Sequence, residues 1–171
     1  MAISVTTTKG IVQEPEHGDP EPIIRVREPL FSEVLTKVHN AKSKAQKIEI
    51  LRREDCTALR QILKWSFDPN IKSALPEGSP PYIENDSPEG GRHMFLRAEG
   101  DKLYRFCEKG DPSLQKMDRE RTFVRLLEGL HKDEAALLVN VKDKKLHQVY
   151  KGLSENVVKE AFGWNDEFRL A

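Results

Sequence analysis

An internal repeat near the C-terminus constrains the fold of this chain more than any other feature. The first copy comprises Phe123, Leu126, Leu127, Gly129, Leu130, Ala135, Leu138 and Val139. The second copy, 23 positions later, comprises Leu146, Val149, Tyr150, Gly152, Leu153, Val158, Ala161 and Phe162. In both copies an apolar stripe with helical spacing leads into a Gly-Leu pair, and a second stripe follows. The repeat predicts two helix–turn–helix units in tandem, which is an architecture and not a chemistry.

The repeat also predicts where its helices begin and end. We expect helices over about 114–128, 132–142, 144–151 and 154–162. Gly129 and Gly152 fit the left-handed residue that often ends a helix, and Ser154 is a good N-cap. The C-terminal half of the chain is therefore predicted to be helical.

Three amphipathic stripes predict that residues 29–67 are helical as well. They consist of Phe31, Val34, Leu35 and Val38, then Ala45, Ile48 and Leu51, and then Leu59, Ile62, Leu63 and Phe67. These spacings place each set on one face of a helix. Asp55 is the expected N-cap of the third helix. Asp68-Pro69 is expected to end it, because proline removes a donor and restricts the residue before it.

Residues 92–109 follow a different pattern. Side chains from Leu103 to Cys107 alternate between two faces, and residues 94–97 could pair with them across a turn at 99–101. This pattern predicts a β-hairpin, and the alternative is a short helix broken at Gly100. The predicted fold class is mainly α with a small β-hairpin (α+β), with tandem helix–turn–helix hairpins in the C-terminal half.

Composition divides the chain into three parts. Residues 1–28 are rich in Thr, Glu and Pro and are predicted to be an extended or disordered arm; the alternative is an arm that pairs with a partner. Residues 29–163 are predicted to form a single, mostly helical domain that contains a Pro-rich loop at 68–91. Residues 164–171 form a short acidic-aromatic tail.

Charge and composition argue against several classes of protein. The 28 Lys and Arg residues balance the 28 Asp and Glu residues, so the net charge is zero. Nucleic-acid binders usually carry a basic excess, so such a partner is not favoured. No apolar run approaches the ~18 residues of a membrane span, and no membrane partner is expected. Cys56 and Cys107 are expected to be reduced cysteines of a cytosolic protein.

The sequence contains no catalytic constellation. The five histidines lie far apart, and none has metal-ligand spacing with a cysteine or an aspartate. No P-loop, dinucleotide fingerprint or nucleophile elbow occurs. We therefore expect no catalytic, cofactor-binding or metal-binding residues, no cofactor and no enzyme activity.

Two segments remain as candidate interaction sites. The tail places Trp164, Phe168 and Leu170 among acidic residues, which favours docking in a partner's groove or folding back over the helical core. The other segment is a basic run in the second predicted helix. This run is either a solvated face or a set of phosphate contacts, and it consists of Lys42, Lys44, Lys47, Arg52 and Arg53.

Several separated strings carry a resemblance over residues 29–165. They are IEILRR at 48–53, LRQIL at 59–63, FDP at 67–69, LPEG at 75–78, PPY at 80–82, LEGLH at 127–131, KDKKL at 142–146, YKGL at 150–153 and VKEAF at 158–162. In this order they resemble a family of uncharacterised proteins of large contractile-tailed phages (myoviruses) of marine bacteria and cyanobacteria. The resemblance implies a viral origin and a location in the host bacterial cytoplasm or the virion, and it transfers no activity and no site residue.

Three function classes follow from these observations. The first is a phage-encoded, non-enzymatic accessory protein that binds a host or phage protein. The second is a nucleic-acid-binding factor in phage replication or transcription, which depends on the basic run and the tandem hairpins. The third is a structural component of the virion, which depends on the N-terminal arm.

Overall fold

A computed structural model of the chain describes residues 28–85 and 93–164. These residues form seven α-helices and two 3₁₀ helices: α1 (Phe31–Asn40), α2 (Lys44–Arg53), α3 (Thr57–Phe67), η1 (Leu96–Ala98), η2 (Gly100–Phe106), α4 (Lys116–Gly129), α5 (Lys132–Lys142), α6 (Leu146–Val149) and α7 (Glu155–Phe162). The prediction of a mainly helical fold is confirmed. Within the described ranges, no helix is both long and apolar enough to cross a membrane.

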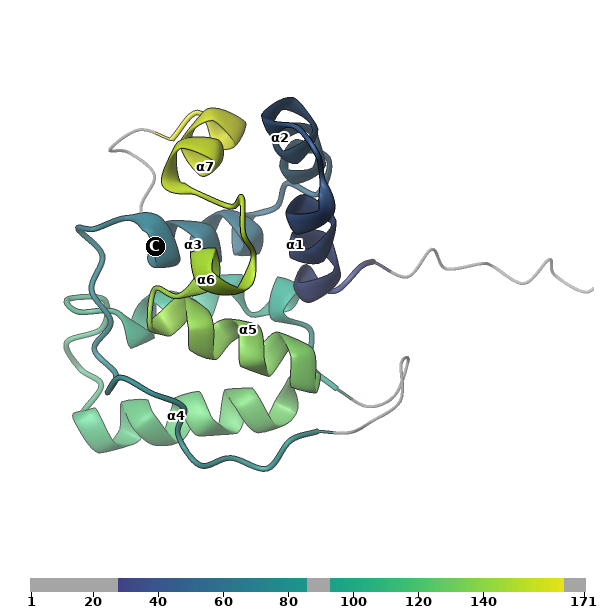
Figure 1. The fold of residues 1–171 in the computed structure, drawn as a ribbon. Helices are drawn as coiled ribbons and strands as arrows, with labels where there is room; N and C mark the ends of the chain where they lie inside the picture. Colours follow the sequence, from purple (N-terminus) through teal and green to yellow (C-terminus); the bar gives the residue numbers. More distant parts are fainter. Residues whose placement is uncertain (1–27, 86–92, 165–171) are drawn as a thin grey trace, which may run out of the picture.

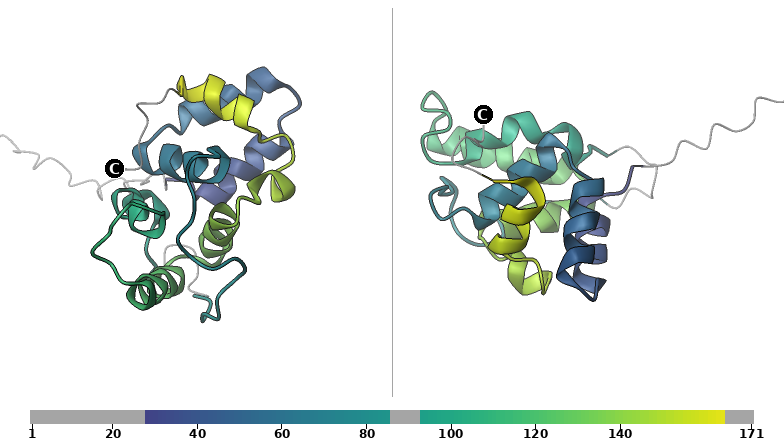
Figure 2. Two further views of the ribbon diagram at one scale, coloured as in Figure 1. Left: turned by 90° about the vertical axis from the view of Figure 1, so that its left-hand side faces the viewer. Right: turned by 90° about the horizontal axis from the view of Figure 1, so that it is seen from above.

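Helix α3 lies at the centre of the fold. It contacts α5, α7 and both 3₁₀ helices. Figure 1 shows α4 and α5 side by side at one end of the molecule, and α2 with α7 at the other end. The two further views in Figure 2 keep α7 beside α2. The helices therefore form two groups that share α3.

The core is built around fully buried aromatic side chains on three elements. The Trp65 ring of α3 stacks on Phe106 of η2 at a centroid distance of 6.3 Å, and Phe106 meets Phe123 of α4 edge-on at 5.2 Å. The indole N–H of Trp65 donates to Ser73 Oγ at 2.8 Å, so its polar atom is satisfied inside the core. This row of rings joins the two groups of helices.

Side-chain acceptors mark the starts of four helices, α2, α3, α5 and α7. Ser154 Oγ accepts a hydrogen bond from the N–H three residues later, which confirms it as the N-cap of α7. Asp55, the expected cap of α3, does not have this role. The cap is Cys56, whose Sγ accepts from Leu59 N at 3.5 Å, and Asp55 forms an ion pair with Arg60.

The predicted hairpin at 92–109 is not confirmed, because residues 96–106 form η1 and η2. Their backbone N–H groups donate to carbonyls three residues back, at 3.0–3.1 Å. The buried side chains are Leu96, Leu103 and Phe106, and the last two have a helical spacing that the alternating pattern concealed. Gly100 packs against α3, where a Cβ would lie 2.6 Å from Ala58. The segment is closer to the alternative, a short helix broken at Gly100, but the break lies at Glu99 and Gly100 begins η2.

The two copies of the sequence repeat form different structures. α5 has the predicted bounds, whereas α6 covers 146–149 instead of 144–151. Lys144 has a left-handed φ of 56°, and its Nζ donates to the carbonyls of Trp65 at 2.7 Å and Asp68 at 2.8 Å. This backbone conformation prevents α6 from starting at residue 144. α7 then packs chiefly against α2.

The two repeated glycines also differ. Gly152 has a φ of +90°, in the region that glycine tolerates best. Gly129 remains inside α4 and does not have the predicted left-handed conformation. A Cβ on Gly129 would lie 2.5 Å from Met94 Sδ, so the glycine allows a close approach of residue 94 to α4.

Candidate binding site

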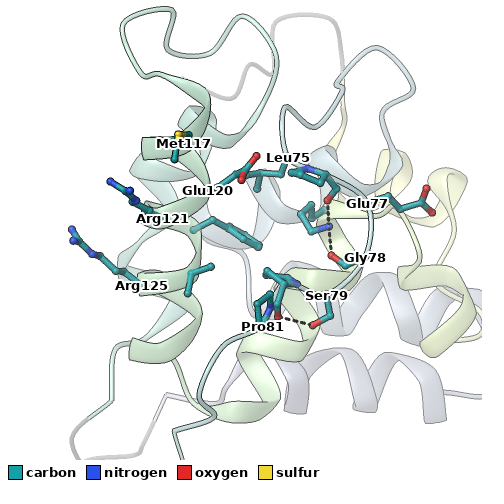
Figure 3. Close-up of a pocket in the computed structure, with 14 residues that line it drawn as sticks. Leu75, Glu77, Gly78, Ser79, Pro81, Met117, Glu120, Arg121 and Arg125 are labelled. Carbon is teal, nitrogen blue, oxygen red and sulfur yellow. Dashed lines mark hydrogen bonds between the residues drawn. The ribbon is translucent and has the colours of Figure 1, made fainter.

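A cavity with many apolar lining residues lies between α4 and residues 75–81. We call it the α4 pocket, and its volume is about 600 Å³. Figure 3 shows α4 on one side and the Pro-rich segment on the other. Half of its lining residues are apolar: Leu75, Pro76, Pro80, Pro81, Met117, Phe123 and Val124. A cavity of this size and character fits the range of ligand-binding pockets.

A buried ammonium group holds the Pro-rich wall in place. Lys142 is only 3 % exposed, and its Nζ donates to the carbonyls of Pro76 at 2.8 Å and Gly78 at 2.9 Å. The same Nζ forms an ion pair with Asp143, whose carboxylate accepts from Gly78 N at 3.1 Å. Lys142 and Asp143 therefore clamp one end of the wall to the end of α5.

The wall is also tied down at its far end. Ile83 N donates to Glu128 Oε1 at 3.2 Å, near the C-terminal end of α4. Between the two ties, Pro80 and Pro81 contribute no backbone N–H. The segment thus runs along α4 without helix or strand, and presents proline rings to the pocket.

The rim of the α4 pocket carries both apolar and charged groups. Met117 is 66 % exposed at the N-terminal end of α4. Figure 3 shows Arg121 and Arg125, one turn apart, leaving α4 on the side away from residues 75–81, whereas Glu120 points toward Leu75. Arg125 has no ion-pair partner among the described residues, and Arg121 lies 4.0 Å from an exposed aspartate. Long, flexible methionine side chains suit surfaces that adapt to a ligand.

A second cavity of about 770 Å³ lies between α1, α5 and α6. Seven of its eleven lining residues are polar, among them Glu33, Lys37, Asp133 and Asn140. Val149, which is 49 % exposed, lies at its edge. The smaller number of apolar groups makes this cavity a weaker candidate than the α4 pocket.

The basic run is engaged largely within the protein. Lys44 pairs with Glu160 at 2.6 Å, and Arg52 donates to the carbonyls of Glu160 at 2.9 Å and Ala161 at 3.0 Å. A guanidinium at those carbonyls satisfies acceptors at the end of α7. Arg53 pairs with Glu49 on its own helix at 3.2 Å. These contacts fasten α2 to α7.

The other two lysines of the run are placed differently. Lys47 is half-buried, and its Nζ lies beside Gly152, where a Cβ would approach within 2.2 Å. Lys42 is exposed at the start of the run. The structure therefore does not bring all five cations together on one open face.

Trp164 packs against the domain. Gly163 has a left-handed φ of 59°, and Trp164 N donates to Lys159 O at 3.2 Å. The indole ring lies 5.5 Å from the ammonium groups of both Lys64 and Lys159, and contacts the hydrophobic core. This placement matches the fold-back alternative for this residue. Phe168 and Leu170 lie outside the described residues.

A buried carboxylate connects α5 to two other elements. Glu134 is 1 % exposed, and its two oxygens accept from Phe31 N and Leu96 N, each at 3.2 Å. Burial raises the pKa of this carboxyl above its usual value, against the opposing effects of these two hydrogen bonds and of nearby His93 and His131. Glu134 therefore positions the starts of α1 and η1.

The two cysteines lie in different surroundings, since Cys107 is buried and Cys56 is only partly buried. Burial raises the pKa of the Cys107 thiol to about 12, which keeps it protonated. Both Cys56 and Cys107 are free thiols. No group of three His, Cys, Asp or Glu residues suited to a metal ion occurs within residues 28–85 and 93–164.

Sequence reasoning missed the buried charges that shape the pocket and the core. Lys142 continues the apolar stripe of Ala135, Leu138 and Val139 at the i+7 position, so helical spacing already placed it on the buried face of α5. A charged residue at such a position signals a satisfied internal contact. The carbonyls that Lys142 binds belong to residues distant in the sequence, and no sequence pattern indicated that they would lie beside Lys142.

A model for a family of unknown function (DUF6433) matches residues 34–148. The chain belongs to this family. The matched region contains both walls of the α4 pocket and the Lys142–Asp143 clamp, whereas α7 and Trp164 follow it. No curated protein and no solved structure matches the chain.

Proposed function

We propose that the chain is a phage-encoded, non-enzymatic accessory protein that binds a host or phage protein through the α4 pocket. The viral origin and the host-cytoplasm location rest on the sequence strings that resemble phage proteins. The observation that carries the binding function is the pocket itself, an apolar cavity with a positioned wall and an exposed methionine at its rim.

The occupant is proposed to be a short segment of a partner protein with apolar side chains and neighbouring carboxylates. Apolar side chains would bury surface against Pro80, Pro81 and Val124. Arg121 and Arg125 point away from residues 75–81, so carboxylates of the partner that extend past the pocket over the outer side of α4 would meet them. Charge complementarity there selects the partner and speeds association. The internal contacts of the basic run favour this function over nucleic-acid binding.

Three tagged chains are expressed in infected cells: the native protein, Met117→Glu and Val149→Glu. The proteins that each chain captures are treated with nuclease and quantified by mass spectrometry. Met117→Glu places a charge at the rim of the α4 pocket at a site that is already exposed. Val149→Glu is the matched control, because it makes the same kind of change at the rim of the second cavity.

The proposal predicts a nuclease-resistant partner that Met117→Glu reduces about tenfold or more, equivalent to ~1.4 kcal/mol of binding free energy. The Val149→Glu chain should retain this partner. Loss of the partner only with Val149→Glu would place binding at the second cavity, and loss on nuclease treatment would favour the nucleic-acid function instead.

A further inference from the structure

A third and smaller cavity lies on another side of α4, between this helix and η2. Its volume is about 200 Å³, and we call it the η2 pocket. Its lining includes the buried side chains of Phe106 and Leu126 and the partly exposed side chain of Met94. Pockets that enclose whole small molecules measure about 300–1,000 Å³. The η2 pocket is therefore suited to a single side chain.

Three cations and one carboxylate also line the η2 pocket. They are Lys102, Arg105, Arg125 and Glu99. Glu99 pairs with Lys102 at 3.1 Å, whereas Arg105 and Arg125 form no ion pair among the described residues. The Nε atom of Arg105 is buried and has no hydrogen-bond acceptor in the same part of the chain. The pocket thus carries two guanidinium groups without a paired carboxylate, and it favours an anion.

Helical geometry places the two pockets on opposite faces of α4. Glu120 and Val124 line the α4 pocket, whereas Thr122 and Leu126 line the η2 pocket. One turn takes about 3.6 residues, so side chains two positions apart point about 200° from each other. Arg125 lines both pockets. It therefore lies on the part of the helix surface that separates them.

The helix surface between the two pockets is open to a partner. Arg121 and Arg125 are exposed there, and Figure 3 shows both side chains leaving α4 on the side away from residues 75–81. A helix with its side chains is about 10–12 Å across, and an extended chain advances ~3.3 Å per residue. An extended segment therefore needs at least about three or four residues to pass from one pocket over α4 to the other.

We infer that the partner segment crosses α4, with apolar side chains in the α4 pocket and one Asp or Glu side chain in the η2 pocket, where Arg105 and Arg125 bind its carboxylate. This inference rests on the proposed function, since it takes the α4 pocket as the binding site of the apolar side chains. Hydrogen bonds between a guanidinium and a carboxylate are charge-assisted and about twice as strong as neutral ones. The η2 pocket therefore selects segments that carry an acidic residue at least about three positions from the apolar anchor.

A displayed library of random dodecapeptides, selected on the full-length protein, tests this inference without a known partner. Peptides are kept if Met117→Glu weakens their binding about tenfold or more, because these peptides occupy the α4 pocket. We expect them to carry an Asp or Glu at a constant distance from an apolar residue. Fluorescence anisotropy then measures the Kd of one such peptide and of its Asn or Gln variant.

Arg105→Gln and Arg125→Gln should each raise the Kd of the acidic peptide about tenfold, because each removes one charge that binds the carboxylate. Replacing the carboxylate of the peptide by an amide should cost about tenfold on the native protein. On the Arg105→Gln/Arg125→Gln double variant it should cost less than about twofold, because the same interaction is already lost. Lys116→Gln is the matched control, because Lys116 is exposed on α4 and lines neither pocket.

Equal costs of the amide replacement on the native protein and on the double variant would overturn the inference. Selected peptides without an acidic residue would overturn it as well. In both cases a peptide that depends on Met117 leaves the proposed function standing. A library that yields no Met117-dependent peptide counts against the proposed function, and this inference fails with it.

Discussion

Replacing Lys142 by methionine tests the clamp that positions the wall of the α4 pocket. Methionine keeps a long apolar side chain but removes the ammonium group from the carbonyls of Pro76 and Gly78. The Asp143 carboxylate, whose side chain is 6 % exposed, loses its counter-charge. Removing one partner of a buried ion pair costs about 3–5 kcal/mol, a large share of the ~5–15 kcal/mol that stabilises a domain.

Urea denaturation followed by circular dichroism, with linear extrapolation, measures this cost. Lys145→Met is the matched control, because Lys145 pairs with Glu77 at 3.5 Å on the exposed surface and such pairs contribute about 0–1 kcal/mol. The Lys142→Met/Asp143→Asn double variant should be more stable than Lys142→Met, because no charge remains buried without a partner. A cost below ~1 kcal/mol for Lys142→Met, equal to that of Lys145→Met, would refute the clamp.

Three further predictions concern the fold. Ser154→Ala should lower the free energy of unfolding by about 0.5–2 kcal/mol, measured by thermal or urea unfolding, because α7 loses its N-cap. Gly100→Ala should cost about 1–3 kcal/mol in the same assay, because its Cβ would lie 2.6 Å from Ala58; an unchanged stability would argue against this packing of η2 on α3. Burial raises the pKa of the Glu134 carboxyl, so the folded protein favours the protonated form. The stability that this proton contributes is complete below the ordinary pKa of about 4.5, and it is lost as the pH rises through the raised pKa. Glu134→Gln should therefore gain stability relative to the wild type as pH rises from about 4 to 8, with His93 and His131 present in both; a constant difference across this range would contradict the shift.

The helices could be predicted from the sequence where an amphipathic stripe determined the buried face. Phe31, Val34, Leu35 and Val38 are all fully buried, as their spacing required. The bounds of α5 were also predictable, because acidic residues begin it and a single apolar pattern runs through it. Local pattern and tertiary burial agree in these segments.

The predictions were wrong for segments in which tertiary contacts override the local sequence pattern. Residues 96–106 alternate in sequence, but Gly100 allows them to pack closely on α3 as 3₁₀ turns. The first repeat copy forms α4 and α5, which pack against each other. The second copy forms α6 and α7 and gives no such pair, because Lys144 adopts a left-handed backbone conformation and α7 packs on α2. A repeat in apolar positions does not reveal such differences.

The candidate site was only partly predictable. The sequence indicated an irregular, Pro-rich segment after α3, but not which helix it lies along. That pairing depends on Lys142, Asp143 and Glu128, whose contacts with residues 76–83 join positions 45–66 residues apart. Spacing rules describe neighbours within one element, and they carry no information about contacts over this separation.

The most direct test of the α4 pocket as a binding site is photo-cross-linking in infected cells. A photoreactive amino acid replaces Met117 in one tagged chain and Val149 in another, and the adducts are identified by mass spectrometry. We expect a covalent adduct with one phage or host protein from position 117 and none of that protein from position 149. An adduct from position 149 alone, or no protein adduct from position 117 in cells where the native chain retains its partner, would contradict it.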